Sequence, residues 1–172
     1  MNAMKVTRAV SAALLATTTL LPAEPAKPTF HYTIFIARPA QDVWDALTQK
    51  PLVDRYYMAP LQKLELEKGG RIAYGDKVAL IMGRVMEIEP PKKLVHSFAF
   101  TGSTDPESVV SYEIAAVGDR MCSLSITHSG FASENQSYTN ISGGWPVIAS
   151  SLKTLLETGK SLPWPEKGLR AE

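Results

Sequence analysis

The sequence predicts an α+β domain in which a curved antiparallel sheet of about seven strands wraps around a long C-terminal helix. Three observations lead to this prediction. Between Leu61 and His128, apolar and polar residues alternate in short segments that turn residues separate, which is typical of neighbouring antiparallel strands. From Ile141 to Leu156, the apolar residues recur at helical spacing instead. One more strand and two short helices are expected before these segments.

The first expected strand covers residues 30–36, where aromatic and β-branched residues alternate with others. Pro39 then stands where the first turn of a helix tolerates proline, and apolar residues at helical spacing predict a helix over residues 40–49. A second short helix is expected over residues 53–58, because Pro60 limits its extension.

Six further strands are expected, and glycine-rich turns such as Gly69-Gly70 and Gly118-Asp119 connect them. A sheet of this size twists and curls until its apolar face is concave. We interpret residues 101–107 as a turn-rich connection and residues 129–139 as a polar loop. The expected strands lie near residues 61–67, 72–74, 78–89, 94–100, 110–114 and 122–128.

The expected terminal helix has one apolar face, and Gly159 stands where a C-terminal cap belongs. This helix can fill the concave side of the sheet. Its apolar face consists of Ile141, Trp145, Ile148, Leu152, Leu155 and Leu156.

Residues 1–26 have the layout of a secretory signal peptide. Lys5 and Arg8 precede an uncharged stretch over residues 9–21, and Ala23 suits cleavage. The stretch is too short to span a bilayer comfortably. We therefore expect an exported protein, periplasmic or secreted, with one domain over residues 27–172. The alternatives are an ordinary Ala-rich helix or a disordered leader, and a cytoplasmic protein.

Composition argues against several classes of function. The formal net charge of +1 and the scattered Lys and Arg residues do not provide the basic surface that nucleic acid requires. The single cysteine, Cys122, cannot form an internal disulfide, and no Cys/His cluster has metal-ligand spacing. We expect no nucleic acid, no metal, no cofactor and no stable membrane span.

Five segments of the chain carry a family resemblance: 39–48 (PAQDVWDALT), 68–71 (KGGR), 83–90 (GRVMEIEP), 124–131 (LSITHSGF) and 143–146 (GGWP). They resemble blocks of one bacterial family, which is named after the activator of the heat-shock protein 90 ATPase and belongs to the START-like (SRPBCC, birch-pollen-allergen-like) superfamily. The resemblance implies a helix-grip fold with an apolar cavity between sheet and helix, and relatives that bind lipids or other hydrophobic molecules. Residues 55–58 (RYYM) depart from the family, which often has tryptophan there.

Residues of one parity along the strands would face the helix and line this cavity. For each of them, taken singly, ordinary core packing is the favoured explanation. The buried imidazoles and phenols among them each need a hydrogen bond, a water or a ligand, and a few polar groups in an apolar concavity are typical of small-molecule pockets. The expected ligand-binding residues are Tyr74, His96, Phe98, Phe100, Tyr112, Ile114, Leu124, Ile126, His128, Trp145, Ile148 and Leu152.

No residue is assigned a catalytic role. His96 and His128 could act as acid or base, but the sequence ties no carboxylate to either of them, so a hydrogen-bonded core role is the alternative. His31 has the opposite parity to Tyr32 and is expected at the surface. Cys122 is expected to be a small buried strand residue.

Three functions remain open. We favour the binding of a hydrophobic or amphipathic small molecule in the cavity. The first alternative is an enzyme of the hydrolase or cyclase type that uses the same cavity. The second is a chaperone or partner-binding module, for which an exposed apolar patch outside the cavity would be expected. A homodimer or a protein partner is compatible with any of these.

Overall fold

The computed structural model describes residues 26–164, and apart from Ala26 the expected leader lies outside the described residues. The described part contains seven strands and three helices. In chain order they are β1 (Phe30–Ile36), α1 (Ala40–Thr48), α2 (Lys50–Tyr56), β2 (Leu61–Leu64), β3 (Arg71–Gly75), β4 (Ala79–Glu89), β5 (Lys93–Phe100), β6 (Ser108–Ala116), β7 (Cys122–Ser129) and α3 (Gln136–Thr158).

The seven strands form one antiparallel sheet in the order β1-β7-β6-β5-β4-β3-β2. The chain from β2 to β7 is a meander, so each strand pairs with the next one along the sequence. β1 closes the other edge by pairing with β7, with Tyr32 opposite Ile126. The α+β class and the antiparallel sheet are therefore confirmed.

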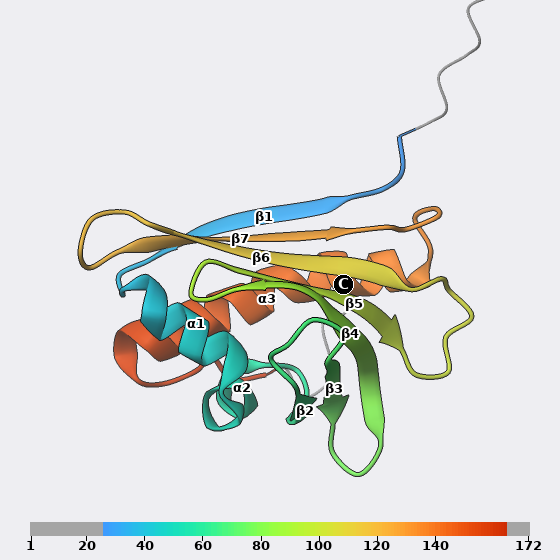
Figure 1. The fold of residues 1–172 in the computed structure, drawn as a ribbon, viewed down its shortest axis with the longest axis horizontal. Coiled ribbons are helices and arrows are strands. Elements are labelled where there is room, and N and C mark those ends of the chain that lie inside the picture. The colour runs from blue at the N-terminus through green and yellow to red at the C-terminus, as the bar shows by residue number, and fades with distance from the viewer. Residues whose placement is uncertain (1–25, 165–172) are drawn as a thin grey trace, which may run out of the picture.

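The long helix lies against the concave side of the curved sheet. In Figure 1, β1, β7 and β6 run above α3, while β4, β3 and β2 curve down beside it. Two contacts hold the helix to the end of β1: Lys153 Nζ donates to the carbonyl oxygen of Phe35 (2.8 Å), and the backbone N–H of Ala37 donates to Glu157 Oε1 (2.7 Å). This arrangement confirms the helix-grip fold.

α3 begins earlier than the sequence pattern indicated. Residues 129–139 were expected to be a loop, but the helix starts at Gln136. Asn135 caps it, because its side-chain oxygen accepts a hydrogen bond from the backbone N–H of Tyr138 (2.9 Å). Asp105 in the β5–β6 connection accepts from both the N–H and the hydroxyl of Ser137 (3.1 and 2.6 Å). Asn135 and Ser137 therefore belong to the start of a helix, which Asp105, a residue distant in sequence, helps to hold.

α2 also begins earlier than expected, at Lys50 instead of Val53. Pro51 stands in its first turn, where the missing N–H needs no partner. Lys50 Nζ and Asp54 form an i,i+4 ion pair (2.8 Å), and Asp54 also accepts from the backbone N–H of Leu61 (2.8 Å). These contacts position α2 at the start of β2.

The chain reverses direction after α3. Gly159 adopts a left-handed conformation (φ 79°), and Arg55 of α2 donates to its carbonyl oxygen (2.6 Å). Trp164 is half-buried against the hydrophobic core. Within residues 26–164, no helix has the combined length and hydrophobicity needed to cross a membrane.

Candidate functional site

The structure brings the twelve expected ligand-binding residues together between the sheet and α3. All are buried except Phe100, which is half-buried. Whether they bind a ligand stays a prediction. They come from β3 (Tyr74), β5 (His96, Phe98, Phe100), β6 (Tyr112, Ile114), β7 (Leu124, Ile126, His128) and α3 (Trp145, Ile148, Leu152).

His128 lies in a chain of hydrogen bonds that joins α3 to three strands. The indole N–H of Trp145 donates to His128 Nδ1 (3.0 Å). Because Nδ1 accepts, the ring carries its proton on Nε2, which donates to Ser108 Oγ (2.8 Å). Ser108 in turn donates to the carbonyl oxygen of Phe98 (3.1 Å). Both nitrogens of His128 are used, so its role in the structure is the hydrogen-bonded core role.

His96 uses only one of its two nitrogens. Its Nδ1 lies 2.7 Å from the carbonyl oxygen of Ser97, so Nδ1 carries the proton and donates it there. Nε2 is then an acceptor, and it has no hydrogen-bond partner among residues 26–164. The side chain is 1% exposed. An unpaired buried acceptor costs about 1–3 kcal/mol, so this nitrogen needs a water or a ligand.

Four buried tyrosines gather beside His96 and Trp145. Tyr57 stacks on Tyr74 with ring centroids 4.6 Å apart, and the rings of Tyr57 and Tyr112 lie 6.3 and 5.8 Å from that of Trp145. Tyr56 lies next to Tyr57 in an edge-on contact. Burial raises the pKa of all four phenols, and their mutual proximity raises those of Tyr56, Tyr57 and Tyr112 further.

Sequence reasoning missed Tyr56 and Tyr57 as site residues. They end α2, and α2 reaches the interior only because the chain folds it against the sheet and α3. A signal was available, since these residues stand in the RYYM segment that departs from the family pattern. His31 is exposed and contacts Thr127 Oγ1 (3.0 Å), as its parity indicated.

Two hollows mark the surface, and none of the twelve expected residues lines either of them. One, of about 260 Å³, lies between the two short helices and the end of α3, and Arg38, Asp42 and Arg55 line it. The other, of about 600 Å³, lies on the outer face of β2 to β5 beside Met82 and Arg84. Between the sheet and α3, aromatic rings instead fill the interior and contact one another. A ligand that binds there would therefore have to displace side chains.

The buried polar residues of the site are all uncharged. They are histidines and serines, and the described core contains no buried carboxylate to pair with either histidine as a general acid or base. Burial lowers the pKa of His96 to about 4 and that of His128 to about 3, so both rings are neutral at neutral pH. Residues 26–164 also contain no group of His, Cys, Asp and Glu that could hold a metal ion.

The two buried histidines predict a loss of stability on mild acidification. In the unfolded chain, both histidines bind a proton below about pH 6.5. In the folded protein, His96 does so only below about pH 4 and His128 only below about pH 3. The free energy of unfolding should fall by about 2 kcal/mol per histidine between pH 6.5 and pH 5. Urea denaturation at pH 7 and pH 5 measures this. His96→Phe should roughly halve the loss and the exposed-site control His31→Phe should not; equal stability at both pH values would contradict the prediction.

The comparisons with known proteins agree with this geometry. Residues 37–157 match the model of the family described as activator of Hsp90 ATPase homolog 1-like protein. The chain belongs to this family. No relative with a curated description matches the chain.

Several solved structures share the fold. CalU16 from Micromonospora echinospora is 22% identical with a TM-score of 0.64, covering 76% of this chain and 77% of that one. An HSP90 activator from Plasmodium falciparum is 21% identical with a TM-score of 0.65, covering 75% and 96%. The Aha1 dimer from Colwellia psychrerythraea is 19% identical with a TM-score of 0.67, covering 78% and 99%. These likenesses support the helix-grip fold of this family member.

Proposed function

We propose that this family member binds an apolar small molecule between the concave face of the sheet and α3. The observation that carries the proposal is the unused hydrogen-bonding capacity of the buried interior. His96 Nε2 has no partner among the described residues, although the side chain is buried and lies beside Tyr112. A few polar groups in an otherwise apolar interior are how ligand sites select and orient a guest.

The glycine pair of α3 offers two positions where an added side chain meets no neighbouring atom. Gly144 lies three residues after Ile141 and four before Ile148, both of which are buried. A Cβ added at Gly144 would nevertheless meet no atom within 4 Å. A ligand burying about 300 Å² of apolar surface would gain about 7 kcal/mol before the cost of association is subtracted. Micromolar affinity is the expected outcome.

The glycine pair also allows a matched test. Gly144→Leu would place a side chain on the partly buried side of α3, whereas Gly143→Leu would place the same side chain on its exposed side. Fluorescence titration with the uncharged probe N-phenyl-1-naphthylamine should show binding to the wild type and to Gly143→Leu, and at least about tenfold weaker binding to Gly144→Leu. No binding to the wild type, combined with no co-purified ligand in native mass spectrometry, would overturn the proposal.

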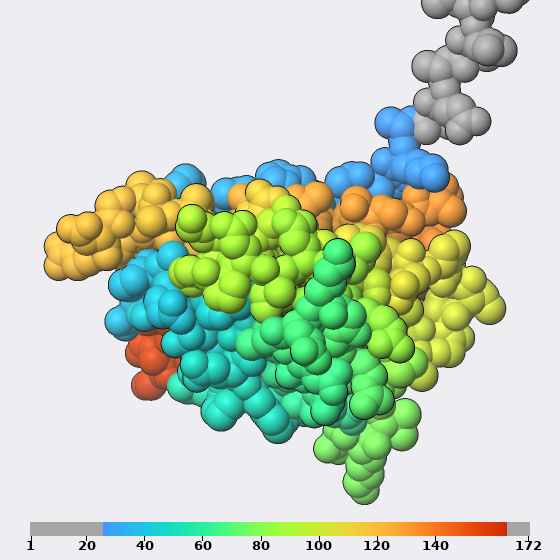
Figure 2. Space-filling view, viewed as in Figure 1, coloured from blue at the N-terminus to red at the C-terminus, as the bar shows by residue number. Residues whose placement is uncertain are grey.

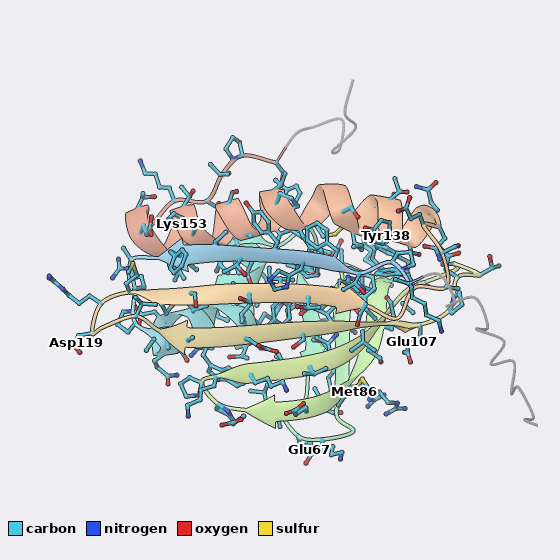
Figure 3. All side chains as sticks on the ribbon, turned by 90° about the horizontal axis from the view of Figure 1, so that it is seen from above. Glu67, Met86, Glu107, Asp119, Tyr138 and Lys153 are labelled. Atoms are coloured by element: carbon cyan, nitrogen blue, oxygen red, sulfur yellow. The ribbon has the colours of Figure 1, made fainter. Side chains whose placement is uncertain are left out.

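A specific surface feature favours a second candidate function, the binding of a protein partner. Leu80, Met82 and Met86 of β4 are 43%, 48% and 46% exposed on the outer face of the sheet, and Met82 lines the 600 Å³ hollow. Figure 3 shows Met86 toward the edge of the sheet opposite α3, and in Figure 2 the β3–β4 hairpin projects from the body. Exposed apolar residues gathered around a hollow are typical of contact surfaces.

The family description names the candidate partner, an Hsp90-type ATPase. If β4 is the contact surface, purified wild-type protein should raise the ATPase rate of a bacterial Hsp90, and Met82→Asp should abolish the increase. Phe35→Asp is the control, because Phe35 is 56% exposed on β1, away from the hollow. An equal effect of both variants, or no effect of the wild type, would count against this function.

A further inference from the structure

We infer that the ligand of the interior site is an uncharged aromatic molecule that carries a hydroxyl group, and that His96 Nε2 accepts a hydrogen bond from that hydroxyl. This inference rests on the proposed ligand-binding function and specifies the class of ligand. It follows from three features of the described residues: the state of His96, the absence of buried charge, and the aromatic rings that lie beside His96.

The state of His96 requires a hydrogen-bond donor. The contact of Nδ1 with the Ser97 carbonyl oxygen (2.7 Å) uses the only proton of the neutral ring. Nε2 can therefore only accept, and it does so from nothing among residues 26–164. A ligand that presents only acceptors, such as an ether or a ketone, would leave this nitrogen unpaired and would lose the corresponding stabilisation.

The lack of buried charge requires an uncharged ligand. The buried polar side chains of the described residues are His96, Ser97, Ser108, His128, Ser137 and Ser151. None of them carries a formal charge when the histidines are neutral. An anionic or cationic guest would leave water without a counter-ion, which costs far more free energy than a neutral hydroxyl that is hydrogen-bonded.

The ring geometry favours a flat guest. His96 and Tyr112 lie with ring centroids 5.9 Å apart and planes 34° apart, and Tyr57 and Tyr74 lie 4.6 Å apart with planes 30° apart. Aromatic rings from β5, β6, α2 and β3 therefore line the interior beside His96. A planar aromatic ring can stack on such faces with more contact than a bulky aliphatic guest.

The hydroxyl groups of the tyrosines complement this arrangement. Unlike His96 Nε2, each phenol can donate as well as accept. A guest hydroxyl that donates to His96 could therefore accept from a neighbouring tyrosine. This pairing would satisfy His96 Nε2, and it distinguishes a hydroxyl from an N–H group, which can only donate.

Three naphthalenes of nearly equal size test the inference: 2-naphthol, 2-methoxynaphthalene and 2-naphthoate. Isothermal titration calorimetry at pH 7 should show 2-naphthol binding to the wild type at least about tenfold more tightly than 2-methoxynaphthalene, with no measurable binding of 2-naphthoate. His96→Phe keeps a ring of similar size and removes the acceptor. It should abolish the preference for the hydroxyl while still binding 2-methoxynaphthalene. His31→Phe, at an exposed position, should keep the preference.

The outcomes separate this inference from the proposed function. Equal binding of 2-naphthol and 2-methoxynaphthalene by the wild type would overturn the hydroxyl assignment, with water as the partner of His96, and would leave the proposed function standing. Tighter binding of 2-naphthoate would overturn the requirement for an uncharged guest. Failure of all three probes to bind would contradict the proposed function itself. The comparison among probes uses the wild-type protein, so it does not depend on whether His96→Phe folds.

Discussion

Replacing Trp145 by alanine is expected to lower the free energy of unfolding by about 4 kcal/mol. Trp145 is 2% exposed and contacts Tyr57, Tyr112 and His128. The substitution removes the ring that these three contact, and it also leaves His128 Nδ1 without its donor. Because small domains are stable by only about 5–15 kcal/mol, the variant should be close to unfolding. Urea denaturation followed by circular dichroism measures the change.

Two variants separate the contributions of Trp145. Trp145→Phe keeps an aromatic ring but removes the N–H, so it should cost about 1–3 kcal/mol, mainly from the unpaired His128 acceptor. Phe35→Ala removes an aromatic side chain that is 56% exposed and should change stability by less than about 0.5 kcal/mol. A loss below about 1 kcal/mol for Trp145→Ala would show that α3 is not held by this contact.

Replacing Gly83 by alanine is expected to cost about 3 kcal/mol and to disturb the candidate site. A Cβ at this position of β4 would lie 1.8 Å from the carbonyl oxygen of Ser97 on β5. That oxygen accepts a hydrogen bond from His96 Nδ1, and Ser97 Oγ accepts one from the backbone N–H of Arg84 (2.9 Å). Backbone atoms cannot rotate away as a side chain does, so the strands must separate and His96 loses its anchor.

Two measurements test Gly83→Ala. Urea denaturation should show a lower free energy of unfolding, and isothermal titration calorimetry of the folded variant should show a lower affinity for 2-naphthol. Gly143→Ala is the matched control, because a Cβ there meets no atom within 4 Å and alanine is the better helix former by about 1 kcal/mol. It should be neutral or stabilising. A Gly83→Ala variant as stable as the wild type would mean that β4 and β5 adjust without strain.

Helices and strands could be predicted where the spacing of apolar residues fits only one type of secondary structure. The alternation in β6 and β7 and the helical spacing of Trp145, Ile148 and Leu152 each predict one structure only, and the structure has it. The start of α3 could not be predicted, because Asn135 and Ser137 are polar residues that suit a loop equally well. Asp105, thirty-two residues before Ser137, is one of the partners that decide between the two.

The lining of the site was predictable from the parity of strand residues, whereas the hydrogen-bond states were not. His96 and His128 are alike in the sequence, each on the inward side of a strand. One has both nitrogens paired and the other has one unpaired, because Trp145 and Ser108 reach only His128. Tyr56 and Tyr57 reach the interior through the packing of α2, which no periodicity along the chain describes.

The spacing of residues along the chain predicts the fold class and the inward-facing residues, because it sets which side of a strand or helix each residue occupies. The family follows from the five segments that resemble its blocks. Which polar groups find partners and which stay unpaired is visible in the tertiary structure alone. Hydrogen bonds depend on distances of about 3 Å between atoms on different elements, and such distances are set by packing instead of periodicity.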